Sequence, residues 1–154
     1  MAVATDNFNR ASENPIAGNW ASAASLGTCK IINDNTVCPV NANTWSGARY
    51  TASASPNDQY SELSYSDVAS LHLPAALVRC DANNGYLAFW YPRYASTDYG
   101  QFYRITGATW TQLGGGNFIE TSGEANHYAG TIRLTITGTT LAVTMPGWVQ
   151  EGNY

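Results

Sequence analysis

Polar and apolar residues alternate with a period of two through most of this chain, and this pattern constrains the fold more than any other feature. Residues 59–68 read QYSELSYSDV, so even positions face one way and odd positions the other. Similar segments, separated by turn residues at intervals of about 8–12 positions, cover 72–79, 86–91, 99–105, 109–113, 131–137 and 140–145. Glycine-containing turns are predicted at 81–85, with Asn84–Gly85 suited to positive φ, and at 106–107, 114–116 and 138–139. Helical periodicity is scarce, which predicts an all-β sandwich or barrel.

Two of the predicted strands differ in what should cover them. Residues 86–91, YLAFWY, are apolar on both faces, so both faces are expected to be covered, with Phe89 and Trp90 in the core. Residues 59–68 have no purely apolar face. We therefore expect that strand to lie over a groove or at a contact surface.

Length and composition indicate one globular domain spanning residues 1–154. Hydrophobic residues make up 44% of the chain, which supports a substantial core. Only 12% of residues are charged, about half the usual ~25%, and neutral hydroxyls and amides take their place. Such a surface suits contacts with sugars or with other subunits. The net charge is −4 and the basic residues are scattered, which argues against nucleic acid as a partner.

Membrane insertion and secretion by the common route are not indicated. The sequence has no apolar run long enough for a spanning helix, which needs about 18 residues. The first five residues, MAVAT, lack the basic and apolar regions of a signal peptide. We expect no signal peptide and no membrane partner, although a leader replaced by a cloning Met is an alternative.

Three cysteines, Cys29, Cys38 and Cys80, are present at spacings that do not match a metal site. If Asn33 and Asp34 form a two-residue hairpin turn, Cys29 lies directly opposite Cys38. Opposite residues are ~4.5–5.5 Å apart at Cα, which a disulfide accepts. A Cys29–Cys38 disulfide and two small buried residues on one face both stay open, and we favour the second. Cys80 is assigned to the core.

The acidic residues do not form the paired carboxylates of a glycoside hydrolase. No Glu lies at a Glu-x-Asp-x-Glu spacing from another acid. Glu62 and Asp67 are five positions apart on one predicted strand and so face opposite ways. Glu120 and Glu124 indicate a solvated pair in a loop. We therefore expect no enzymatic activity.

Metal binding is not expected either. His72 and His127 lack both metal spacing and a nucleophile motif nearby. Calcium is the one cation that deserves consideration, since two turn regions are rich in oxygen ligands: Asp6, Asn7 and Asn9, and Asp81, Asn83 and Asn84. Such clusters more often cap their own backbone, so we assign no metal and no cofactor.

Aromatic residues are abundant, with five Trp, ten Tyr and four Phe, and they are densest between positions 86 and 103. Trp and Tyr fill sandwich cores, lead at protein–protein hot spots, and stack on sugar rings. Those near turns or an edge are expected to be exposed and to contact a glycan or another subunit: Tyr91, Tyr94, Tyr99 and Trp148. Nearby arginines, Arg79, Arg93 and Arg104, are expected to pair with acids across the same contact.

Several short motifs follow one another along nearly the whole chain. They are DNFNR at 6–10 with NW at 19–20, NDQY at 57–60, LVRCD at 77–81 before an aromatic strand, and IRLTI at 132–136 followed by LAV at 141–143. In order and spacing the chain resembles the concanavalin A-like lectin/glucanase (laminin-G-like) β-sandwich of phage virion and environmental bacterial proteins. The resemblance implies two antiparallel sheets of jelly-roll type. It implies no activity, because this fold hosts lectins, hydrolases and shell proteins alike.

One departure from the family pattern concerns the last strand. Relatives continue through a loop to a final strand beside the N-terminal one, whereas this sequence ends at Tyr154. An unpaired N-terminal strand would leave open N–H and C=O groups, which proteins normally cover. Three interpretations stay open: a truncated chain, a shortened domain, or an edge completed by a neighbouring subunit. The expected edge contacts are Asp6, Phe8, Arg10, Val149 and Tyr154.

These features favour a non-enzymatic virion structural protein, such as a phage capsid decoration or cement protein or a fibre-associated component. It is expected to assemble in the host cytoplasm, to form a homo-oligomer such as a trimer, and to contact a major capsid or tail protein. The alternative is a carbohydrate-binding, lectin-like module that recognises cell-surface glycan through exposed Tyr and Trp. An open edge and few charges favour the first, and an aromatic strip with flanking amides would favour the second. A glycoside hydrolase comes third.

Overall fold

The computed structural model describes residues 6–32, 36–41, 44–52, 56–65, 73–91, 99–119, 129–145 and 148–153. These residues form strands and no helix, and therefore no helix that could cross a membrane. The strands are β1 (Trp20–Ser22), β2 (Cys29–Ile32), β3 (Thr36–Pro39), β4 (Ala48–Tyr50), β5 (Gln59–Tyr65), β6 (Ala75–Val78), β7 (Asn84–Tyr91), β8 (Tyr99–Thr106), β9 (Thr109–Ile119), β10 (Gly130–Thr137), β11 (Thr140–Met145) and β12 (Trp148–Asn153). All strand pairings are antiparallel. The predicted all-β, antiparallel fold is confirmed.

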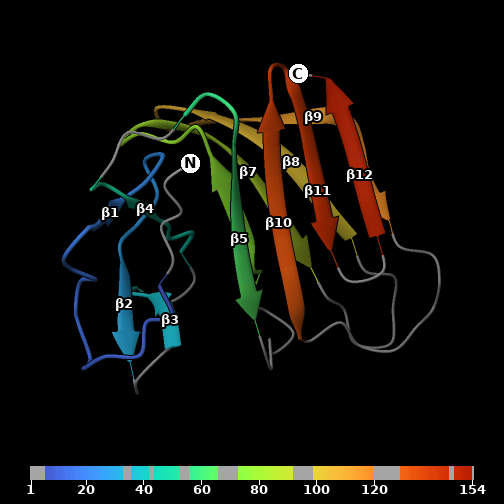
Figure 1. Ribbon diagram of the computed structural model, residues 1–154. Coiled ribbons are helices and arrows are strands. Elements are labelled where there is room, and N and C mark those ends of the chain that lie inside the picture. Colours follow the sequence, from blue (N-terminus) through green and yellow to red (C-terminus); the bar gives the residue numbers. More distant parts are fainter. Residues whose placement is uncertain are drawn as a thin grey trace.

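Two four-stranded sheets form the larger part of the molecule. One has the order β12-β11-β10-β5 and the other β6-β7-β8-β9, while β1-β4 and β2-β3 are two-stranded. Figure 1 shows the first sheet, green to red, in front of the second, with the blue N-terminal strands to one side. The arrangement is compatible with a β-sandwich.

The main core lies between the two four-stranded sheets. Trp90 and Val78 from one sheet pack with Ile132, Leu134 and Val143 from the other, and all of these side chains are fully buried. Burying each one stabilises the fold by about 1.5–3 kcal/mol.

A second core explains why β7 is buried on both faces. Leu87 and Phe89 point away from the main core and pack against residues 23–26 of the N-terminal segment. Ala88 and Trp90, at the alternate positions, face the main core. The prediction that both faces of this segment are covered is confirmed, as is the assignment of Phe89 and Trp90 to the core.

Strand β5 alternates as predicted. Tyr60 and Glu62 are exposed, whereas Leu63 and Tyr65 pack against the main core. β5 lies at the edge of its sheet, paired with β10 alone.

The predicted turn at 114–116 is wrong, because these glycines lie inside β9. The register between β8 and β9 pairs Phe102 with Leu113 but Gly100 with Phe118, so several β9 residues face the single residue Gln101. Glycines therefore accommodate a bulge here and do not reverse the chain.

The turn predicted at 81–85 is confirmed for residues 81–83, which connect β6 to β7, but Asn84 and Gly85 belong to β7 and do not have the expected positive φ. The residue with positive φ in this connection is Arg79, at 46°. Gly85 is needed for close approach, because a Cβ there would lie 3.0 Å from the Cβ of Cys80. The turns at 106–107 and 138–139 are confirmed, with Gly107 and Gly138 at positive φ.

The expected N-terminal strand with an open edge is not found among the described residues of that segment. Residues 6–10 form no strand, and β12 is paired with β11 at the far side of the sheet from β5. Figure 1 shows β12 on the far side of the molecule from the blue N-terminal strands. Val149 lies in β12, and Tyr154 lies outside the described residues.

Candidate functional site

Six aromatic side chains gather on the face of the β6-β7-β8-β9 sheet that is turned away from the main core. Odd positions of β7 and β8 share this face, because Phe89 pairs with Gln101 and Tyr91 with Tyr99. The pairing of Ile105 with Trp110 places Trp110 on the same side. Together with one residue from the N-terminal segment they form what we call the aromatic face: Trp45, Phe89, Tyr91, Tyr99, Tyr103 and Trp110.

The rings of the aromatic face contact one another. The ring centroid of Trp45 lies 5.3 Å from that of Phe89 and 5.3 Å from that of Trp110. Tyr103 stacks on Phe89 at 6.0 Å and meets the edge of Trp110 at 5.5 Å. Each such pair stabilises the fold by about 0.5–1.5 kcal/mol beyond area burial. The rings are therefore held in place before any ligand arrives.

Exposure varies across the aromatic face. Phe89 is buried, the tyrosines and Trp110 are half-buried, and Trp45 is 39% exposed. The Tyr103 hydroxyl donates to Oε1 of Gln101 at 2.6 Å, and Gln112 is exposed directly opposite Tyr103. The face thus combines stacking surface with amide groups, which can engage the apolar side and the hydroxyls of a sugar.

Trp45 is held by its backbone, although it lies in no strand. The Gly27 N–H donates to the Trp45 carbonyl at 2.9 Å, and the Gly47 N–H donates to the Gly27 carbonyl at 3.1 Å. A Cβ on Gly27 would lie 3.1 Å from the Trp45 carbonyl oxygen and 3.0 Å from Oγ of Ser46. Because Gly27 has no side chain, the backbone at Trp45 and Ser46 can lie close to it.

Of the predicted contact residues, the structure brings two together. Tyr91 and Tyr99 meet edge-on with their centroids 5.1 Å apart. Trp148 begins β12 in the other sheet, so it does not belong to the aromatic face. Arg93 and Tyr94 lie outside the described residues.

Four members of the aromatic face were not predicted as contact residues: Phe89, which was assigned to the core, and Trp45, Tyr103 and Trp110. Trp110 follows the alternation of segment 109–113, and the pairing register would have placed it opposite Ile105. Trp45 gives no such signal, because it lies in an irregular segment and reaches Phe89 only through the tertiary fold.

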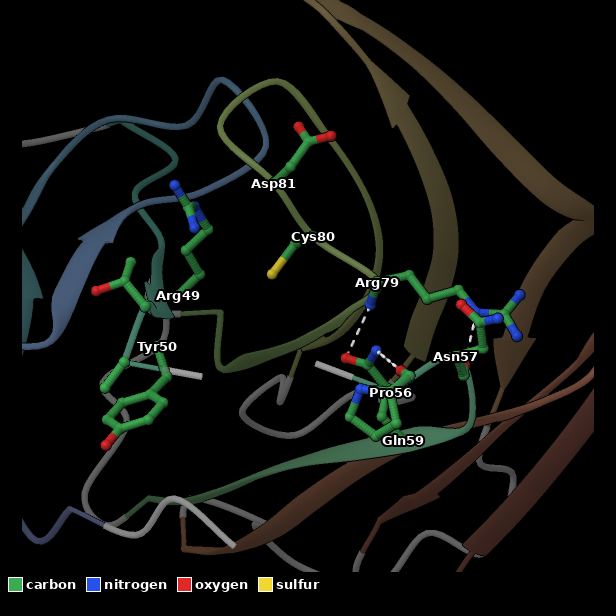
Figure 2. Close-up of a pocket in the computed structure, with 10 residues that line it drawn as sticks. Arg49, Tyr50, Pro56, Asn57, Gln59, Arg79, Cys80 and Asp81 are labelled. Atoms are coloured by element: carbon green, nitrogen blue, oxygen red, sulfur yellow. Dashed lines mark hydrogen bonds between the residues drawn. The ribbon is translucent and has the colours of Figure 1, made fainter. Parts of the chain in front are cut away.

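A second feature is a cleft of about 530 Å³ between β4, the start of β5 and the segment after β6 (Figure 2). Its lining is mostly polar and includes Arg49, Tyr50, Asn57, Gln59, Arg79 and Asp81. Figure 2 shows Arg49 and Cys80 on facing sides of this space, with the Arg79 guanidinium turned toward Asn57.

Arg79 is fully committed to structural contacts. Its backbone N–H donates to Oε1 of Gln59 at 3.0 Å. In the side chain, Nε donates to the Asn57 carbonyl at 2.7 Å and Nη2 to the Gly138 carbonyl at 2.7 Å. Asp58 lies 3.7 Å from the same guanidinium. Arg79 therefore joins the start of β5, the end of β6 and the β10–β11 turn.

Arg49 contrasts with Arg79. Among the residues that the structure describes, the Arg49 side chain has no hydrogen-bond or ion-pair partner, and its Nε is buried. Leaving a buried donor unsatisfied costs about 1–3 kcal/mol. The arrangement suits a group that supplies an acceptor from outside the chain.

The other ionisable groups of the cleft have defined states. The Asn84 side chain and the N–H groups of Asn83 and Asn84 donate to Asp81 and lower its pKa, and the charge of Arg49 adds to this effect. Burial raises the pKa of Cys80, which the charge of Arg49 only partly offsets. Asp81 is thus ionised and Cys80 is a protonated thiol.

The predicted edge residues Asp6, Phe8 and Arg10 form an internal network. The Arg10 guanidinium pairs with Asp6 at 2.7 Å and with Glu13 at 2.9 Å. Asp6 also accepts the Trp20 Nε1–H at 2.8 Å and the Phe8 N–H at 2.7 Å, while the Phe8 and Trp20 rings lie 5.3 Å apart. These groups stabilise the N-terminal segment from within.

The two carboxylates of that network are not an acid/base pair. Burial alone would raise the pKa of Asp6, but its hydrogen bonds from Phe8, Arg10 and Trp20 lower it overall. Hydrogen bonding from Arg10 lowers the pKa of Glu13. With both groups ionised, neither holds the proton that a general acid needs.

Other predicted polar sites are accounted for by local contacts. Glu62 pairs with Arg133 at 2.6 Å on the outer face of β5 and β10. Asn7 accepts the Asn9 N–H, so this turn caps its own backbone, as the Asp81 turn does.

No group of three metal-ligating side chains occurs within the described part of the chain. Asp67, His72, Glu120, Glu124 and His127 lie outside it.

The predicted register of the cysteine hairpin is wrong. β2 pairs Cys29 with Pro39 and Lys30 with Cys38, so three residues separate the strands where two were expected. This one-residue shift turns Cys29 and Cys38 to opposite faces, and both thiols are free. Burial raises the pKa of the Cys29 thiol to about 11.

In comparisons with known proteins, no family model, no curated protein and no solved structure matches the chain.

Proposed function

We propose that this chain is a non-enzymatic, lectin-like binding domain that recognises a glycan through the aromatic face. The observation that carries the proposal is the convergence of Trp45 with rings from β7, β8 and β9, beside the amides of Gln101 and Gln112. Aromatic rings present a stacking surface, and a few placed polar groups fix ligand orientation. Because the rings already restrain one another, binding costs little additional side-chain entropy.

The way the described carboxylates are used supports a role without catalysis. Glu62 is paired with Arg133, and Asp6 and Glu13 share Arg10. A glycosidase needs two carboxylates facing one groove, one of them protonated. These residues are better explained as structural and surface ion pairs.

We further infer that the two large sheets are of the jelly-roll type of the concanavalin A-like lectin/glucanase family. The order of the sequence motifs supports this, as do the two antiparallel four-stranded sheets around one core. In this interpretation the N-terminal strands form a cover over one outer face, and the aromatic face lies at its margin.

A glycan array probed with the purified chain tests the proposal. We expect the wild type to bind a defined set of glycans, and Trp110→Ala to lose that binding. Tyr60→Ala is the matched control, because Tyr60 is an exposed aromatic residue of the other sheet. A wild-type chain that binds no glycan would contradict the proposal.

A second candidate is a structural subunit of a virion, such as a phage decoration, cement or fibre-associated protein. The observation that favours it is β12, which among the described strands has a neighbour on one side only and leaves an edge for pairing with another subunit. Light scattering after size-exclusion chromatography at two concentrations distinguishes the candidates. A stable trimer or larger assembly supports the virion subunit, and a monomer that binds glycan supports the lectin-like domain.

A further inference from the structure

The cleft beside β4 contains one guanidinium that forms no hydrogen bond or ion pair within the described chain. Arg79 donates to three carbonyl or amide oxygens and lies near Asp58, whereas Arg49 has no polar partner among the described residues. A guanidinium presents its donors in a planar fork that matches two acceptor oxygens of one group. Arg49 therefore lines the cleft with its charge, while its Nε, which is itself buried, has no hydrogen-bond partner in the described chain.

Asp81 does not fill this role, although it lines the same cleft. Its carboxylate already accepts the N–H of Asn83 at 2.6 Å, the N–H of Asn84 at 2.8 Å and the Asn84 side-chain amide at 3.0 Å. These bonds hold the turn that leads into β7. Releasing Asp81 to pair with Arg49 would leave those donors unsatisfied.

The rest of the cleft suits a small polar molecule. Its volume of about 530 Å³ lies within the ~300–1,000 Å³ of ordinary ligand sites. Tyr50 and Asn57 line it, and their side chains make no hydrogen bond to another described residue. They offer neutral donors and acceptors for hydroxyl groups.

The charges at and around the cleft decide which kind of anion it can bind. One free guanidinium balances one negative charge, and the nearby Asp81 carboxylate together with the net charge of −4 disfavours a dianion such as phosphate. We propose that this cleft is a second binding site, in which Arg49 binds the carboxylate of an acidic sugar while Tyr50 and Asn57 contact its hydroxyls. This second site depends on the proposed glycan-binding function in one respect, namely that a sugar carries the carboxylate.

The test uses the Arg49 Nε–H resonance of the full chain in ¹⁵N-edited NMR. Methyl β-glucuronide is titrated as the acidic probe, methyl β-glucoside as its neutral counterpart, and acetate and inorganic phosphate as simple anions. We expect a saturable shift of the Arg49 signal with the glucuronide, and binding at least about tenfold weaker for the glucoside. An unmoved Arg49 signal, or equal binding of both sugars, would overturn the proposal. Tighter binding of phosphate than of the glucuronide would overturn the assigned ligand class.

Substitutions give a second readout. Arg49→Gln keeps much of the side-chain volume and is expected to weaken glucuronide binding by about tenfold or more. Arg104→Gln removes the same charge from an exposed position of β8 and is expected to bind within about twofold of wild type. Equal affinity of the two variants refutes the role of Arg49. If Arg49→Gln fails to fold, the wild-type titration decides alone.

The two proposals fail separately. A chain that binds glycans through Trp110 but shows no Arg49 response keeps the lectin-like function and loses the second site. A chain that binds no arrayed glycan but shows the Arg49 response to glucuronide keeps the second site and loses the aromatic face as a glycan contact.

Discussion

Replacing Trp45 with alanine separates the binding role of the aromatic face from its contribution to stability. Trp45 is 39% exposed, so about 60% of a side chain that can bury ~150–250 Å² is covered, or ~90–150 Å². At ~25 cal/mol per Å² this burial corresponds to about 2–4 kcal/mol. A domain typically has ~5–15 kcal/mol of unfolding free energy, so Trp45→Ala is expected to stay folded.

Binding should suffer more than folding. Trp45 is the most exposed ring of the aromatic face and contacts both Phe89 and Trp110. Truncating an aromatic residue at the centre of a contact typically costs at least ~1.4 kcal/mol, or about tenfold in affinity. Tyr60→Ala is the matched control, because Tyr60 is 44% exposed and packs on Arg133 at the outer face of the other sheet.

The assay combines urea unfolding followed by circular dichroism with glycan affinity at a temperature where both variants are folded. The expected result is a folded Trp45→Ala that binds at least about tenfold more weakly, and a Tyr60→Ala that binds as wild type. Unchanged affinity in Trp45→Ala, or a loss confined to Tyr60→Ala, would refute the assignment of the aromatic face.

Three further predictions concern the fold. Leu134→Ala should lower the unfolding free energy by about 2–5 kcal/mol in urea, because Leu134 is fully buried, and the exposed Thr137→Ala should change it by less than about 0.5 kcal/mol. The pKa of Asp6 is lowered in the folded chain from its ordinary 3.8, so its stabilising contribution is present at neutral pH and is lost as pH falls below about 4. The difference in urea midpoint between wild type and Asp6→Asn should therefore shrink in that range, and a difference independent of pH would contradict it. Iodoacetamide near pH ~8 should modify Cys38 before Cys29 by mass spectrometry, because burial raises the pKa of Cys29 to about 11. A Cys29–Cys38 disulfide found without reductant would contradict the observed register.

Alternation predicted the strands of the two large sheets except β12, because the predicted strands each have one face toward a core. β5, β10 and β11 match their predicted segments closely, and β7 was identified as covered on both faces. The same signal could not identify what covers β7. Its outer face is packed against residues 23–26, an irregular segment without periodicity, whose position depends on the tertiary fold.

Turn chemistry was less informative, because glycine and asparagine serve several purposes. The glycines at 114–116 accommodate a bulge within β9, and Gly85 allows Cys80 to approach. The register of the β2–β3 hairpin was also predicted wrongly. One additional residue between β2 and β3 moved Cys29 and Cys38 to opposite faces, and no local pattern distinguishes a two-residue from a three-residue connection there.

Both candidate sites lie where the N-terminal segment meets the large sheets, and neither uses the main core. Trp45 covers one margin of the β7–β9 face, and Arg49 of β4 lines the cleft beside β5 and the segment after β6. Packing within the N-terminal segment, through Arg10 and Trp20 on one side and Gly27 on the other, fixes the backbone that carries these residues. A ligand that stacks on a ring already restrained by its neighbours loses little in ordering the protein. Such a junction allows ligand contacts to vary while the sandwich core stays unchanged.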